Sequence, residues 1–207
     1  MPLSTAEFDA DAGRFDRPEE SASSDLATAT VEAEQIWGLR LARLSYQGAL
    51  DRLSLQSDDI DDFTRFIPSA LRYAQIYRYM DKKELAKKYY DEARSILEAG
   101  IQQYPEDARF HGSLGIAYAG LGRKEDAITE ENLAIKLVNN HAVIYPYRIE
   151  ELARIYVMVG EFDAAIDQLK HLLSIPGPFS TSLLQLDPAW APLRNHPRFK
   201  KLIKSDK

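Results

Sequence analysis

One spaced set of small and aromatic residues occurs three times in this chain and limits its fold more than any other feature. The gaps between successive members are 3, 4, 5, 4 and 3 residues in each copy. A small residue, an aromatic one, a turn and a second amphipathic stretch are typical of two closely packed antiparallel helices. We therefore expect an all-α fold in which helix pairs stack as a repeat array. The three copies are Ala74, Tyr77, Asp81, Ala86, Tyr90, Ala93; Gly115, Tyr118, Gly122, Ala127, Glu131, Ala134; and Ala153, Tyr156, Gly160, Ala165, Leu169, Leu172.

The third position of each copy is the turn between the two helices. Gly122 and Gly160 stand there in two copies, and glycine adopts the left-handed backbone of such a turn without steric cost. Asp81 replaces glycine in the first copy, and aspartate tolerates the same conformation. The first period is 41 residues and the second is 38. The excess in the first period falls in 95–104, which predicts a lengthened second helix.

The sequence outside the repeats indicates an arm, a connector and a cap. Residues 1–29 are rich in Ala, Ser, Asp and Glu and predict a flexible acidic arm. Residues 30–175 predict the repeat domain, and 176–207 predict a proline-rich connector with a C-terminal capping helix. The units expected within the domain are a degenerate one at 30–56 and full ones at about 69–104, 107–139 and 146–175.

An acidic segment, 57–68, precedes the first full unit. We expect Asp61 or Asp62 to cap a helix that begins near Phe63. Pro68 would lie early in that helix or just before it, where its missing N–H does little harm.

The charge is concentrated at the N-terminus. The net charge is −6, and residues 1–32 alone contain eight acids and two bases. The rest of the chain is balanced, so no nucleic-acid partner is expected. There is no apolar run near 18 residues, so we expect no membrane span or membrane partner. The acidic N-terminus lacks the apolar core of a secretory signal, and we expect a cytoplasmic protein.

No motif for catalysis or metal binding stands out. The chain has no cysteine, which excludes disulfides and thiolate sites. The four histidines lie in different units without metal-binding spacing, and there is neither a GxSxG motif nor a Gly-rich phosphate loop. We therefore expect no enzyme activity, no metal and no cofactor; an enzyme with an unrecognised site is a further alternative. The histidines are His111, His141, His171 and His196.

A candidate binding surface follows from the first helix of each pair. The positions that the packing pattern leaves free should line a concave groove. Arginines at three of these positions suit carboxylates of an acidic or C-terminal peptide. An alternative, equally open, is that the arginines are solvated or pair with neighbours such as Glu150. The candidate residues are Leu71, Gln75, Arg78, Arg109, Ile116, Tyr147, Glu150 and Arg154.

The pattern over 69–175 resembles tetratricopeptide repeats. Three segments are also similar to the closing part of bacterial tetratricopeptide regions at the C-termini of multidomain signalling proteins: Ser/Thr protein kinases, adenylate cyclases and transcriptional regulators. The run Leu-Asp-Pro…Trp…Pro-Leu-Arg…Pro-Arg-Phe is the most diagnostic part. We expect no kinase, cyclase or DNA-binding domain within these 207 residues. The segments are Gly115–Ala127, Glu151–Ile175 and Leu186–Ile203.

The resemblance implies a right-handed superhelical scaffold with no catalytic residues. The expected function is a non-enzymatic adaptor that binds a protein or peptide in its groove and takes part in bacterial signalling. The alternative is a regulatory subunit, or a separated C-terminal module, of a kinase- or cyclase-like enzyme. The acidic arm, with Phe8 and Phe15, could fold into the arginine-bearing groove of its own chain or of a second copy, so a homo-oligomer is also conceivable.

Overall fold

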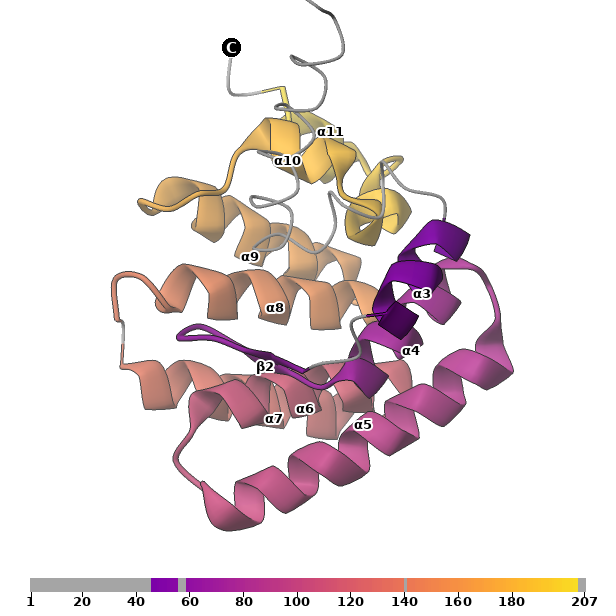
Figure 1. Ribbon diagram of the computed structural model, residues 1–207. Helices are drawn as coiled ribbons and strands as arrows, with labels where there is room; N and C mark the ends of the chain where they lie inside the picture. Colours follow the sequence, from indigo (N-terminus) through magenta and orange to yellow (C-terminus); the bar gives the residue numbers. More distant parts are fainter. Residues whose placement is uncertain (1–45, 56–58, 140, 205–207) are drawn as a thin grey trace, which may run out of the picture. The chain divides into compact units, whose positions relative to one another are not determined.

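Antiparallel helix pairs form most of the computed structural model (Figure 1). The structure describes residues 46–55, 59–139 and 141–204, which belong to one compact unit, Gly38–Lys207. The expected acidic arm, including Phe8 and Phe15, lies outside the described residues.

Three helix pairs follow one another along the chain. Neighbouring helices pack against each other both within and between pairs, so the predicted all-α array is confirmed. The pairs are α4 (Ser69–Tyr79) with α5 (Lys83–Gln103), α6 (Ala108–Gly120) with α7 (Lys124–Val138), and α8 (Tyr145–Met158) with α9 (Phe162–Ser174).

The small residues of the repeat make this packing close. Six alanines at repeat positions are completely buried. A Cβ atom on Gly115 would lie 2.9 Å from Ile155 Cδ1 and 3.0 Å from the carbonyl oxygen of Ala127. A larger residue at this position would therefore require α6 or its neighbours to shift. The alanines are Ala74, Ala93, Ala127, Ala134, Ala153 and Ala165.

The turns between paired helices have the predicted backbone. Asp81, Gly122 and Gly160 have φ angles of 55°, 78° and 83°, all in the left-handed region. The lengthened second helix is also confirmed, since α5 has 21 residues, whereas α7 has 15 and α9 has 13.

The acidic segment forms a hairpin, so the helix start expected near Phe63 is wrong. Strand β1 (Ile60–Asp61) pairs with β2 (Phe66–Ile67) in antiparallel register. Asp62 Oδ1 accepts hydrogen bonds from the backbone N–H groups of Thr64 and Arg65 and therefore stabilises the turn. Pro68 disfavours helical backbone at the residue before it, which suits a strand at Ile67.

Helix α4 instead begins at Ser69, directly after Pro68. The carboxylate of Asp59 accepts a hydrogen bond of 2.8 Å from the Ser69 N–H. The helix start is therefore stabilised by a side chain ten residues upstream, across the hairpin.

The two ends of the described array are covered by short elements. Helix α3 (Tyr46–Leu55) packs on α4, with the Tyr46 ring stacked on Tyr79 at 6.2 Å between centroids. Beyond α9, helix α10 (Thr181–Leu186), the 3₁₀ helix η1 (Pro188–Leu193) and α11 (Pro197–Leu202) form the C-terminal cap. Trp190, Leu193 and Phe199 of the cap are buried in one cluster with apolar residues of α9.

Candidate functional site

The candidate groove residues all lie on the first helices of the three pairs. Leu71, Gln75 and Arg78 belong to α4, Arg109 and Ile116 to α6, and Tyr147, Glu150 and Arg154 to α8. Leu71 and Ile116 are in the core, at 1% and 4% exposure, so their side chains do not offer an open surface. Glu150 and Arg154 are largely buried, with side chains 13% and 14% exposed, and the other four are half-buried.

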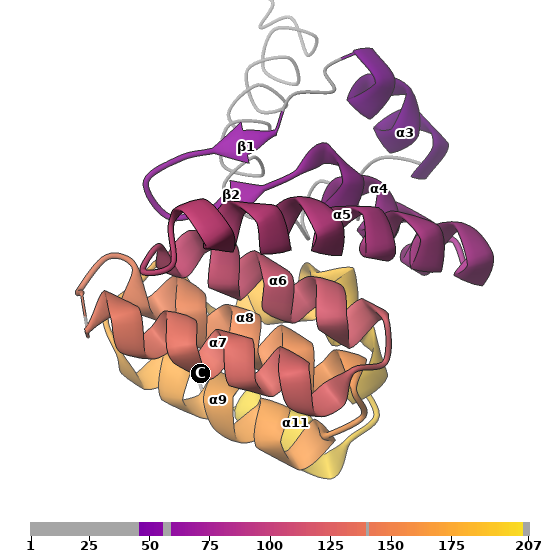
Figure 2. The same cartoon turned by 90° about the horizontal axis from the view of Figure 1, so that it is seen from below.

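Helix α6 is buried around its whole circumference over residues 111–119. Helices α5, α7 and α8 pack against it, and so does strand β2. Figure 2 shows β1 and β2 on one side of α6 and α7 on the other. The middle of the first-helix face is therefore covered by the chain's own hairpin.

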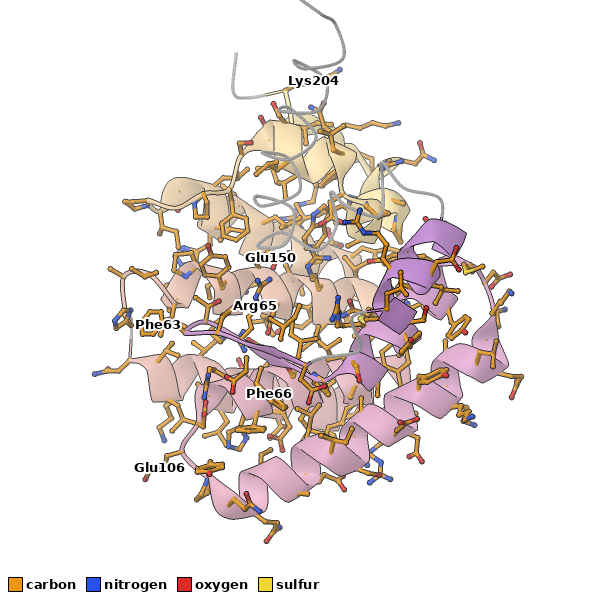
Figure 3. The ribbon with its side chains drawn as sticks, in the orientation of Figure 1. Phe63, Arg65, Phe66, Glu106, Glu150 and Lys204 are labelled. Atoms are coloured by element: carbon orange, nitrogen blue, oxygen red, sulfur yellow. The ribbon has the colours of Figure 1, made fainter. Side chains whose placement is uncertain are left out.

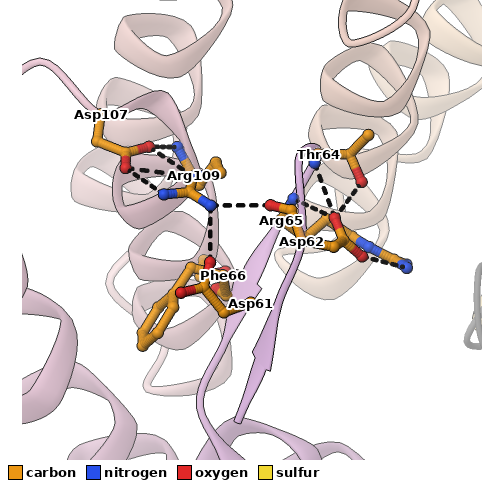
Figure 4. Close-up of polar contacts among 8 residues, drawn as sticks. Asp61, Asp62, Thr64, Arg65, Phe66, Asp107 and Arg109 are labelled. Atoms are coloured by element: carbon orange, nitrogen blue, oxygen red, sulfur yellow. Dashed lines mark hydrogen bonds and ion pairs between the residues drawn. The ribbon is translucent and has the colours of Figure 1, made fainter.

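Arg109 joins the hairpin to α6 (Figure 4). Its Nη1 donates to Asp61 Oδ1 at 2.7 Å and to the backbone oxygen of Asp62 at 2.8 Å. Its Nη2 donates to Asp107 Oδ2 at 2.8 Å. Burial raises the pKa of the Asp107 carboxyl, but hydrogen bonds from Arg109 and its charge outweigh burial and lower it overall. Arg109 therefore already binds an acidic segment, and that segment is its own hairpin.

Two further contacts hold the hairpin on α6. The Ser113 hydroxyl donates to the backbone oxygen of Phe66 at 2.5 Å. The Phe66 ring packs on Phe110 with 4.5 Å between centroids. Figure 3 shows Phe63 at the tip of the hairpin, and its side chain is largely exposed. The hairpin is thus anchored along β2, and at its tip the Phe63 ring packs edge-on against His141, with 5.7 Å between centroids.

Arg154 is also engaged, in a cluster between α8 and the cap. It donates to Glu150, and its Nη2 donates to Asp187 Oδ2 at 2.5 Å. Its guanidinium carbon lies 5.1 Å from the centre of the Trp190 ring. Burial lowers the pKa of Arg154, but the charges of Asp187 and Glu150 outweigh burial and raise it. Nearby, burial raises the pKa of Tyr79 to about 12.

Arg78 differs from the other two arginines. Within the described ranges, no carboxylate forms an ion pair with it, and its guanidinium lies 5.8 Å from the Tyr79 ring centre. Of the other candidates, Tyr147 packs edge-on against Phe179 at 5.6 Å. Arg109 and Arg154 therefore form ion pairs with neighbouring acids. The binding of a peptide by the three arginines stays a prediction.

A buried charge cluster at the contact of α6, α7 and α8 was not predicted from the sequence. Arg148 Nη2 lies 2.8 Å from Glu151 Oε2, and Arg148 Nη1 lies 3.9 Å from Glu131 Oε1. A Cβ on Gly112 would lie 1.5 Å from Arg148 Nη1, so only glycine leaves space for the guanidinium. The signal was available, because Glu131 stands at the repeat position of Tyr90 and Leu169.

The described polar groups include one buried histidine, His111. His111 is buried, with Nδ1 2.7 Å from Glu130 Oε2 and Nε2 2.9 Å from the Pro105 oxygen, which is a structural role. Among the described residues, no three His, Asp or Glu side chains converge as a metal site. In the same part of the chain, no helix is both long and apolar enough to cross a bilayer.

These features define the class of protein as an array of stacked helix pairs. Residues 67–101 match the family model described as tetratricopeptide repeat, so the first pair, α4 and α5, is such a repeat. No curated protein matches the chain, and neither does any solved structure.

Proposed function

We propose that this protein is a non-enzymatic adaptor that binds a protein partner on its first-helix face. The observation that carries the proposal is the tetratricopeptide repeat at 67–101, stacked with two further helix pairs. Tetratricopeptide arrays present extended surfaces to partners and carry no catalytic groups of their own. A signalling role, alongside a kinase- or cyclase-like enzyme, is the finer form of the proposal and is supported by the likeness of Leu186–Ile203 to the ends of such proteins.

A peptide-display selection on the full chain tests the proposal. Bound peptides should slow amide hydrogen exchange in α4 and α8, and Arg78→Glu should weaken an acidic binder by about tenfold. Arg198→Glu is the matched control, because Arg198 lies on α11 and its partners are Asp163 and Asp167. Failure to select any binder, or protection confined to α7 and α9, contradicts the proposal.

A further inference from the structure

The hairpin of residues 60–67 has the chemistry of a bound peptide. Two backbone oxygens, of Asp62 and Phe66, accept hydrogen bonds from side chains of α6. One carboxylate, of Asp61, binds the guanidinium of Arg109. One ring, of Phe66, packs on Phe110. Backbone acceptors, an acidic group and an aromatic anchor are the features by which grooves recognise extended segments.

The hairpin depends on α6 for its own order. Each strand has two residues, and a two-stranded hairpin of this size is not stable in water by itself. Its ion pair with Arg109 is partly exposed, since 64% of the Asp61 side chain is accessible, and is therefore weak. Arg65 and Ile67 are buried, but residues 61–63 are exposed, and exposed segments open locally at a lower free-energy cost than the buried core does.

We infer that the hairpin is an internal occupant of the groove over α6, and that the partner is an extended protein segment with an acidic residue and an aromatic residue that replaces it. This rests on the proposed adaptor function and names the partner's chemistry. Arg109 binds the partner's carboxylate, Ser113 binds a backbone oxygen, and Phe110 holds its ring. Occupation of the groove by the hairpin lowers the apparent affinity of any such partner.

A labelled peptide with the hairpin sequence, DIDDFTRFIP (residues 59–68), is the probe. It is titrated into the full chain and into a variant whose residues 60–66 are replaced by a Gly-Ser segment of equal length. The variant should bind the peptide at least about tenfold more tightly than the original chain, because its groove is empty. Adding Arg109→Gln to the variant should reverse the gain. A peptide with Asp61→Asn and Phe66→Ala is the matched control and should bind weakly.

A milder variant covers the case in which the replaced chain fails to fold. Asp62→Ala removes the turn bonds and leaves the groove side chains in place, so it should also tighten peptide binding, with faster hydrogen exchange confined to 60–67. If the variants with a replaced or loosened hairpin bind the peptide no more tightly than the original chain does, the inference is wrong. Dimer formation by exchange of hairpins in place of peptide binding also overturns it.

The outcomes separate this inference from the proposed function. If display-selected peptides bind to α4 and α8 but do not compete with the hairpin peptide, the adaptor function stands and the hairpin inference fails. If neither kind of peptide binds to the original or the opened chain, both fail.

Discussion

Glu131 Oε1 lies 3.9 Å from Arg148 Nη1, and both side chains are excluded from solvent. Arg148 already pairs with Glu151 at 2.8 Å, so the site contains two carboxyl groups for one guanidinium. Burial raises the pKa of Glu131 well above its usual value, and the attraction of Arg148 only partly opposes this. A second carboxylate charge in a dry site is unfavourable, and protonation of Glu131 relieves it.

Glu131→Gln should make the stability of the protein less dependent on pH. The pKa of Glu131 is higher in the folded state, so the folded chain holds a proton that the unfolded chain has released. Wild-type stability therefore falls as pH rises from 4.5, the ordinary value, through the raised folded pKa. The variant lacks this loss and should be the more stable protein at pH 8 but not at pH 4. Urea unfolding of both proteins at pH 4 and at pH 8 measures the difference in stability.

Glu92→Gln, at an exposed position on α5, is the control for this comparison and should follow the wild type. A constant difference between Glu131→Gln and wild type at both pH values would contradict a raised pKa.

Gly112→Ala should strongly destabilise the fold. The new methyl group would overlap Arg148 Nη1, at 1.5 Å, and displace the guanidinium from Glu151. Overpacking and the broken buried pair together should cost about 3 kcal/mol or more. Gly177→Ala is the matched control, since its nearest atom would be at 3.5 Å, an ordinary contact. Chemical denaturation of both variants measures the loss of stability. Equal unfolding midpoints would refute the role of Gly112.

Arg154→Met should weaken the attachment of the C-terminal cap. It leaves the buried carboxylates of Glu150 and Asp187 without their cation, which should cost about 2–4 kcal/mol. Arg198→Met breaks a similar two-carboxylate contact at the surface, with Asp163 and Asp167, and should cost much less because solvent screens these charges. Thermal unfolding compares the two. Similar losses in both variants would mean that burial of Arg154 adds nothing.

Asp62→Ala should loosen the hairpin turn without affecting the helices. Three hydrogen bonds to Asp62 Oδ1 are lost, from the Thr64 N–H, the Thr64 hydroxyl and the Arg65 N–H. Amide exchange at Thr64 and Arg65 should speed up by about tenfold, which corresponds to about 1.4 kcal/mol. Amides of α8 serve as the internal control. Unchanged exchange in the turn would show that the pairing of β1 with β2 keeps the turn ordered without these hydrogen bonds.

Much of the array was predictable because its signals are local or periodic. The spacing of Ala74, Gly115 and Ala153 predicts where helices approach closely, and the turn positions predict left-handed backbone at Asp81. The hairpin was not predictable in this way. Asp62 can cap a helix or stabilise a turn, and only the presence of α6 beneath the segment decides between the two.

The candidate site, too, was predictable from the sequence only in part. Helical spacing placed the candidate residues on the first helices, and it named Arg109 and Arg154 together with one correct partner, Glu150. It did not reveal that Asp61 and Asp187, 48 positions before Arg109 and 33 after Arg154, complete their ion pairs.

By itself, the sequence determined the helix pairs, their turns and the close contacts at small residues, because these depend on neighbours a few positions apart. Tertiary structure alone decided that a hairpin covers α6, that Arg148 occupies the space left by Gly112, and that Leu71 and Ile116 lie in the core. Those outcomes depend on how segments distant in the chain fill space and neutralise charge together, and no local pattern encodes that.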